Sequence, residues 1–257
     1  MRESRREHWD TFWEERPVEE VYESVGDLVG ELDRWADLPG LRILEVGAGS
    51  GRDSRLLASR GALVSVLDYS LPALNSSLGG RAPEGIQAIR ADALQLPFQN
   101  NSFDVVFHQG LLEHFRDPVP LLKENVRVLA PGGILLVDVP QRWHYYTLVK
   151  RILIALDRWF AGWECSFSAR ELEGLLRDCG LEHLTTYADW PKPGLPYRAL
   201  RKLLSRLRLK LPASPPQPPL FVRTGDSLRK SLRYSRAGHY SAMVIGCVAR
   251  KPGDSIG

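Results

Sequence analysis

The sequence predicts an α/β fold in which a mostly parallel β-sheet is covered by helices on both faces. Apolar runs with the length of buried strands alternate with amphipathic helical patterns through the first part of the chain, an order that is typical of parallel sheets. A glycine-rich turn, GAGSG, follows the first of these runs at residues 47–51. With 257 residues, of which 44% are hydrophobic and 25% charged, the chain suits one globular α/β domain.

The elements can be assigned in chain order. Apolar residues recur at helical spacing over 21–35 and end at a Pro–Gly pair. Strands are expected at the apolar runs 41–47, 61–70, 85–93, 103–110 and 132–140, with helices between them at 53–60, 71–77 and 118–129. Further helices are expected over 148–160 and from Ser168, where Glu171 would complete an N-terminal capping box. A last strand is expected at 238–251.

Composition and termini exclude several classes of protein. The three cysteines are widely spaced and odd in number, which indicates neither a disulfide framework nor a zinc site. Free thiols in a reducing compartment are expected instead. The first fifteen residues lack the apolar core of a secretory signal, and charged residues interrupt the apolar stretch 148–163. We therefore expect a cytoplasmic protein with no membrane span.

The glycine-rich turn differs from that of dinucleotide-binding enzymes. Glycines at a strand-to-helix turn let the backbone pass close to a ligand and present amide groups to it. Dinucleotide enzymes use G-x-G-x-x-G, in which the third glycine allows close helix packing. This chain has G-x-G-x-G, and Arg52 stands where that third glycine would be. Glu45, just before the turn, would oppose a pyrophosphate but could bind a positively charged amino group.

Two further acids follow the next two predicted strands. Asp68 ends the second strand, where it could accept hydrogen bonds from ribose hydroxyls, and Asp92 follows the third strand, where it could bind an exocyclic amine. A glycine turn alone is weak evidence for a function. A glycine turn with acids at three successive strand ends is much more specific.

These segments resemble the class I S-adenosylmethionine-dependent methyltransferases. The resemblance rests on EVGAGSG, LDYS, ADALQLPF, NSFDVVF, LLEH and LAPGG, which occur in this order over roughly residues 41–140. Within the class, the chain is similar to the methyltransferase type 11 and quinone-precursor O-methyltransferase group. The resemblance implies a Rossmann-like three-layer αβα sandwich, with a seven-stranded sheet that is parallel except for its last strand. It also implies S-adenosylmethionine as the cofactor.

The resemblance further implies which residues bind the cofactor. The segment from Glu45 to Gly51 would border its methionine part, Asp68 would hold the ribose, and the end of the fourth strand would lie under the sulfonium. The full expected set is Glu45, Gly47, Ala48, Gly49, Gly51, Asp68, Tyr69, Asp92, Ala93, His108 and Gln109. No metal site is expected, because Gly110 replaces the first glutamate of the E-x-L-E-H pattern in the quinone-precursor enzymes.

Three histidines are candidate general bases for transfer of a methyl group to a hydroxyl or an amine. His114 follows the fourth strand near the expected cofactor; alternatively, it only caps the next helix together with Glu113. His108 could touch the reacting region or merely satisfy backbone groups at a strand end. His144 belongs to QRWHYYTLVKR (141–151), whose aromatic residues could wall an acceptor pocket or pack under the next helix.

We expect a single domain over residues 1–257. Its parts would be N-terminal helices with a lid (1–38), a cofactor-binding core (41–140), an acceptor-side region (141–190), a basic proline-rich insertion (191–237) and the last strand (238–251). Trp9, Phe12 and Trp13 share one helical face near the N-terminus. In similar enzymes such a segment covers the cofactor as a lid; a plain docked helix is the alternative.

The insertion is strongly basic. Between Lys192 and Arg236 there are twelve Lys or Arg residues and one acid. Residues 196–212 place leucines along one stripe with cations around it, which predicts a basic amphipathic helix. Such a helix could contact an anionic membrane surface, cover an acidic acceptor, or dock on its own domain. Nucleic acid is the least favoured partner, because no aromatic platform accompanies the charge.

Together these features predict an S-adenosylmethionine-dependent methyltransferase. Its acceptor would be a small molecule or lipid-like, methylated at oxygen or nitrogen mainly through proximity and orientation. Two alternatives remain open. One is an NAD-dependent Rossmann oxidoreductase, against which Arg52 argues, and the other is a regulator that binds the cofactor without catalysis.

Overall fold

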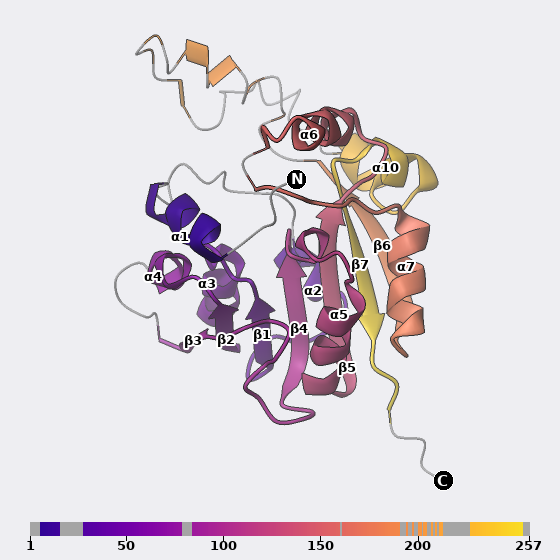
Figure 1. The fold of residues 1–257 in the computed structure, drawn as a ribbon. Coiled ribbons are helices and arrows are strands. Elements are labelled where there is room, and N and C mark those ends of the chain that lie inside the picture. The colour runs from indigo at the N-terminus through magenta and orange to yellow at the C-terminus, as the bar shows by residue number, and fades with distance from the viewer. Residues whose placement is uncertain are drawn as a thin grey trace.

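A seven-stranded sheet with the order β3-β2-β1-β4-β5-β7-β6 forms the centre of the molecule (Figure 1). The computed structural model describes residues 6–15, 28–78, 84–159, 161–190 and 227–253, together with single positions between 194 and 212. The strands are β1 (Arg42–Val46), β2 (Leu63–Asp68), β3 (Ile86–Arg90), β4 (Phe103–Gln109), β5 (Leu129–Pro140), β6 (Glu182–Asp189) and β7 (Val244–Arg250).

The sheet is parallel except around its last strand. The pairs β1–β2, β1–β4, β2–β3 and β4–β5 are all parallel. β7 lies between β5 and β6 and runs antiparallel to both of them. The predicted fold class, a three-layer α/β sandwich with an antiparallel last strand, is confirmed.

Helices cover both faces of the sheet (Figure 1). They are α1 (Arg6–Glu15), α2 (Leu28–Leu32), α3 (Arg52–Ser59), α4 (Leu71–Leu78), the 3₁₀ helix η2 (Leu112–His114), α5 (Val119–Val128), α6 (Tyr145–Ala155), α7 (Ala169–Asp178) and α10 (Arg236–Ser241). One apolar cluster holds residues of α2, α3 and α4 against β1, β2 and β4. A second cluster holds residues of α5, α7 and η2 against β1, β4, β5 and β7. The two clusters fill the two interfaces of the sandwich.

Several boundaries differ from the sequence prediction. The last strand begins only at Val244, because residues 236–241 form α10. Gly238 lets that helix lie very close to the segment before it: a Cβ there would lie 2.0 Å from the carbonyl oxygen of Leu232. α6 begins at Tyr145 rather than near Leu148, because His144 caps it. The capping box predicted at Ser168 is confirmed in α7.

Parts of the predicted organisation lie outside the described residues. These parts are the first half of the helix expected over 21–35, most of the proline-rich piece 212–220, and the cations Arg198, Lys202, Arg206 and Lys210 of the basic stretch. Within the portion of the chain that the structure describes, no helix is long and apolar enough to cross a bilayer.

The register of the sheet brings the predicted acids together. Glu45 pairs with Val66 of β2 and with Phe107 of β4, so its carboxylate lies near the carboxyl end of three neighbouring strands. Asp68 is the last residue of β2 and Gln109 the last of β4. In open α/β sheets, ligands bind in the crevice at this edge, where the strand order reverses. The reversal here lies between β1 and β4.

Candidate functional site

A cavity of about 420 Å³ opens at the carboxyl ends of β1, β2, β3 and β4. It falls within the range of small-molecule sites, about 300–1,000 Å³. Nine of the eleven expected cofactor residues line it: Glu45, Gly47, Ala48, Gly49, Asp68, Tyr69, Asp92, Ala93 and Gln109. Gly51 and His108 are not among its lining residues. Gly51 instead begins α3 as its N-cap, in the left-handed conformation.

The glycine turn has a backbone that side chains would disturb. Gly47 and Gly49 have φ angles of 67° and 50°, in the region that residues with a Cβ rarely adopt. Space is also short. A Cβ on Gly47 would lie 2.9 Å from the Leu111 side chain, and one on Gly49 would lie 2.5 Å from the Trp13 indole. The turn is therefore closely covered from two sides.

Asp68 ties the end of β2 to this turn. Its Oδ2 accepts a hydrogen bond from the amide of Gly49 (3.1 Å), and its Oδ1 accepts one from the amide of Ser70 (2.9 Å). The carboxylate is buried, and desolvation raises its pKa above the usual value despite these hydrogen bonds. Each carboxylate oxygen can accept more than one hydrogen bond. Asp68 can therefore hold the turn and bind a paired diol at the same time.

Glu45 is buried beneath the turn. The hydroxyl of Ser54, on α3, donates a hydrogen bond to its Oε2. Burial raises the pKa of Glu45 to about 8. A positively charged group placed against this carboxylate would favour the ionised form of Glu45. The ionised carboxylate would in turn attract that group. Glu45 is thus suited to an ammonium group.

Arg52 has a partner that explains its place in the turn. Its guanidinium donates to both carboxylate oxygens of Asp53, at 3.2 and 2.8 Å. Asp53 in turn accepts a hydrogen bond from the side-chain amide of Gln109 (2.6 Å). The arginine therefore neutralises a largely buried acid, and that acid fixes the orientation of Gln109 at the end of β4. The sequence analysis did not single out Asp53, whose only signal was its position one residue after Arg52.

The helix α1 covers the cavity from above. Trp9 and Trp13 both line it. Trp13 packs against Gly49, while the Trp9 ring stands edge-on to the His114 ring with centroids 4.9 Å apart. One helix thus packs on both the glycine turn and His114.

The three candidate histidines lie in different surroundings. His114, at the end of η2, lines the cavity, and desolvation lowers its pKa. His108 is completely buried on β4, neither ring nitrogen has a hydrogen-bond partner, and burial lowers its pKa to about 3. His144 caps α6, where its Nδ1 accepts from the amide of Tyr146 (3.3 Å). Only His114 of the three lines the cavity.

Comparisons with known proteins agree with this geometry. A family model described as "Methyltransferase domain" matches residues 44–137. A ubiquinone biosynthesis O-methyltransferase from Pseudomonas putida is 30% identical over 68% of this chain and 77% of its own length. The chain belongs to the class I S-adenosylmethionine-dependent methyltransferases. The resemblance noted in the sequence is confirmed, and the oxidoreductase alternative is not favoured.

Two further matches are to a second relative and to a solved structure. A demethylmenaquinone methyltransferase from Renibacterium salmoninarum is 38% identical over 45% of this chain and 52% of its own length. The match thus spans about half the length of that relative. A solved SAM-dependent methyltransferase from Methanosarcina mazei superposes with a TM-score of 0.60 at 19% identity, covering 89% of this chain and 100% of its own. The last likeness supports the fold alone.

The cavity of this methyltransferase fits S-adenosylmethionine, the cofactor that family membership implies. Three carboxylates, those of Glu45, Asp68 and Asp92, line one space and can accept hydrogen bonds from the ammonium, diol and amine groups of such a ligand. The glycine turn between these acids carries no side chain at Gly47 and Gly49, because Leu111 and Trp13 lie too close to leave room for one.

Three buried ionisable side chains, those of Lys150, Glu164 and Glu113, lie near His114. The ammonium of Lys150 is 2.7 Å from Glu164 Oε2, and both side chains are almost fully buried. The indole of Trp159 donates to the other oxygen of Glu164 (2.7 Å). Glu113 is buried nearby with its Oε2 unpartnered, and desolvation raises its pKa to about 8. The sequence analysis missed the Lys150–Glu164 pair, because no spacing in the sequence links residues on α6 and on the loop after it.

Proposed function

We propose that this chain transfers a methyl group from S-adenosylmethionine to the oxygen or nitrogen of a small-molecule or lipid-like acceptor. The observation that carries the proposal is a single cavity that is lined by the glycine turn, three acids and His114 together. In this assignment Glu45 binds the amino group of the methionine part, Asp68 the ribose, and Asp92 with Ala93 the adenine. Gln109, fixed by Asp53, lies beside the reacting centre.

The mechanism rests mainly on positioning. When bound, S-adenosylmethionine supplies an electrophilic methyl group on its sulfonium. The protein holds the acceptor in line with that methyl group and excludes water under α1. His114, which lines the cavity, would take the proton that the acceptor's hydroxyl or amine gives up when it receives the methyl group. Because its pKa is lowered, His114 is neutral near pH 7 and can act as this base. His108 is buried in β4 and His144 caps α6. Neither has a role in this proposal.

The acceptor is best sought among aromatic hydroxyl compounds. The cavity near His114 is walled by apolar and aromatic side chains, Trp9, Leu111 and Phe115, which favour a flat ring over a charged chain. One relative is named as a demethylmenaquinone methyltransferase and another as a ubiquinone biosynthesis O-methyltransferase. Both lines of support point to a quinol-like acceptor.

Two measurements test this function. Calorimetry with S-adenosylhomocysteine and, separately, NAD should give binding of the first and none of the second. Turnover with a radiolabelled methyl donor should then be measured on a panel of aromatic hydroxyl and amine acceptors, with His114→Gln as the matched variant. Binding of S-adenosylhomocysteine without turnover on any acceptor would favour a cofactor-binding regulator. Absence of that binding would refute the proposal as a whole.

We also propose that the protein works in the cytoplasm and contacts anionic membranes peripherally through 196–212. Leu200, Leu203 and Leu207 of this stretch are exposed. α6 adds a second exposed apolar face, formed by Tyr145, Leu148, Val149, Ile152 and Leu156. The excess of cations between residues 192 and 236 suits a negatively charged lipid surface.

Sedimentation with phosphatidylserine vesicles at two salt concentrations tests the membrane contact. Each Lys or Arg near such a surface contributes about 1 kcal/mol, so exchanging three cations of 196–212 for Gln should weaken binding about a hundredfold at low salt. Ile152→Gln on α6 tests the apolar face without changing the charge. If the wild-type protein fails to sediment at low salt, the membrane contact is excluded and the exposed faces need another partner.

A further inference from the structure

The wall of the cavity that we assign to adenine is a loop without regular structure. It connects β3 to β4 over residues 91–102, and Asp92, Ala93 and Leu94 at its start line the cavity. The Asp92 carboxylate is held within this loop, because its Oδ1 accepts from the amide of Leu94 (2.9 Å). Loops of this kind keep one conformation only where other parts of the protein hold them.

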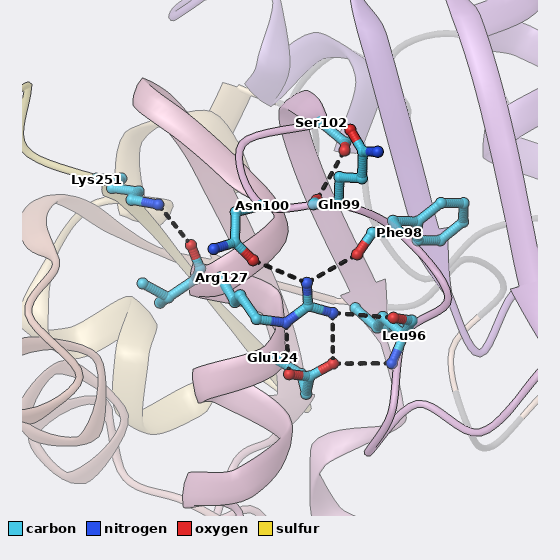
Figure 2. Close-up of polar contacts among 9 residues, drawn as sticks. Leu96, Phe98, Gln99, Asn100, Ser102, Glu124, Arg127 and Lys251 are labelled. Atoms are coloured by element: carbon cyan, nitrogen blue, oxygen red, sulfur yellow. Dashed lines mark hydrogen bonds and ion pairs between the residues drawn. The ribbon is translucent and has the colours of Figure 1, made fainter.

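Two side chains of α5 hold this loop by its backbone (Figure 2). Arg127 donates to the carbonyl oxygens of Leu96 (2.9 Å) and Phe98 (2.7 Å) and to the side-chain oxygen of Asn100 (3.1 Å). Glu124 accepts from the amide of Leu96 (2.8 Å). The same guanidinium also binds both carboxylate oxygens of Glu124, at 2.7 and 2.8 Å. We call these two side chains the α5 clamp.

The α5 clamp is itself firmly placed. The Lys251 ammonium donates to the carbonyl oxygens of Val126 (2.9 Å) and Leu129 (2.7 Å), which fixes the last turn of α5 against the end of the sheet. The backbone of Arg127 accepts from the amide of Asn101 (3.0 Å), so the loop is also bonded to α5 at its far end. The hydrogen bond from Arg127 lowers the pKa of Glu124, which keeps this carboxylate ionised.

The clamp reaches the cavity through a short chain of bonds. Leu96, which both clamp residues bind, is buried and lies two residues beyond Leu94. Leu94 is the residue whose amide holds the Asp92 carboxylate. A displacement of Leu96 would therefore move the acid that we expect to accept a hydrogen bond from an exocyclic amine.

We propose that Arg127 and Glu124 are positioning residues that give the cofactor site its selectivity for adenine. This inference rests on the proposed function, because it needs a nucleobase against Asp92. The clamp residues touch no ligand. They hold the loop so that the Asp92 carboxylate meets an amine donor, and a base that carries a carbonyl oxygen at the same place is rejected. Without the clamp, the loop can relax toward such a base, and selectivity falls together with affinity.

Binding of two ligands tests this selectivity. The probes are S-adenosylhomocysteine and S-inosylhomocysteine, which differ at the position of the exocyclic amine. In Arg127→Met, affinity for S-adenosylhomocysteine should fall about tenfold, and affinity for the inosine compound should fall no more than about twofold. The ratio of the two affinities is the decisive quantity, because a merely structural loss would lower both together. Arg127→Lys keeps the positive charge, but an ammonium cannot make the paired hydrogen bonds of the planar guanidinium, so this variant should resemble Arg127→Met.

A control pair exists at the amino ends of β1 and β4, away from the cavity. Arg42 makes a comparable two-bond pair with Asp104 (3.1 and 2.6 Å), at the start of β1. Arg42→Met removes a two-bond pair with a carboxylate but no side-chain bond to the 91–102 loop, so it should leave the ratio of affinities unchanged. If Arg127→Met does not fold, Glu124→Gln, which removes the charge and one of the two acceptor oxygens, replaces it in the same assay.

The outcomes separate this inference from the proposed function. If the wild-type protein binds no S-adenosylhomocysteine, the proposed function fails first. If the wild-type protein binds it with selectivity, and Arg127→Met and Glu124→Gln retain both affinity and ratio, the role of the clamp is refuted. A loss of selectivity in both clamp variants but not in Arg42→Met supports it.

Discussion

Gly49→Ala tests two reasons for a glycine at residue 49, its left-handed backbone conformation and its contact with Trp13. Two costs are expected. Residue 49 has a φ of 50°, and holding a residue with a Cβ in the left-handed region costs roughly 1–2 kcal/mol. The added Cβ would also stand 2.5 Å from the Trp13 indole, far inside van der Waals contact, so the indole must shift. We expect the free energy of unfolding to fall by about 2–4 kcal/mol.

Trp13→Ala separates the contribution of the contact between Trp13 and residue 49. In the double variant the clash is gone, so the loss of stability should shrink toward the backbone cost alone, with a coupling of about 0.5–3 kcal/mol in the double-mutant cycle. Cofactor affinity should behave differently. We expect the bound ligand to take the space over residue 49 that the Trp13 indole fills in this structure, so affinity for S-adenosylhomocysteine should remain at least about tenfold below that of Trp13→Ala.

Gly132→Ala is the control for backbone strain. Its φ is 78°, yet a Cβ there would meet nothing within 4 Å, so it carries the conformational cost without the contact. Urea denaturation and calorimetry with S-adenosylhomocysteine give both quantities for each variant. If the double variant binds as tightly as Trp13→Ala alone, the reasoning is refuted, and Gly49 serves to seat the indole rather than the cofactor.

The other predictions concern buried charge. Burial raises the pKa of Glu45 from 4.5 to about 8, so its contribution to stability is fully present below pH 4.5 and is lost as the pH rises through 8; Glu45→Gln should show a smaller loss than wild type in urea denaturation between about pH 5 and about pH 9. Lys150→Met leaves Glu164 buried without its cation and should cost about 3–5 kcal/mol in thermal or urea unfolding, most of which Lys150→Met with Glu164→Leu should recover. Asp68→Ala removes a charged acceptor, so affinity for S-adenosylhomocysteine should fall about ten- to a hundredfold by calorimetry, and a loss under about twofold would place Asp68 away from the ribose.

The sequence was most informative where a local pattern determines local structure. The apolar runs predicted the strands that form the core, and the capping box at Ser168 could be found because its two members are only three residues apart. The acids at the strand ends could also be found, because the carboxyl ends of parallel strands share one edge. These features depend on periodicity and topology, both of which the sequence carries.

Contacts between distant segments could not be found in this way. The packing of Trp13 on Gly49 joins residues 36 positions apart, and the pair of Lys150 with Glu164 depends on how the chain turns after α6. The burial of His108 was equally hidden, because a histidine at a strand end has the same sequence pattern whether it faces a ligand or the core. The helix α10 was mistaken for strand, since the close approach at Gly238 depends on Leu232 in the preceding turn.

The position of β7 has a consequence for how the protein folds during synthesis. This strand is the last of the seven along the chain, yet it lies inside the sheet, between β5 and β6. While the ribosome is still making it, β6 has no neighbour and β5 presents an unpaired edge, both of which invite association with other nascent chains. The sheet can close only after residue 250 has left the ribosome tunnel. A premature stop ahead of β7 would therefore leave two open edges rather than a slightly shorter sheet.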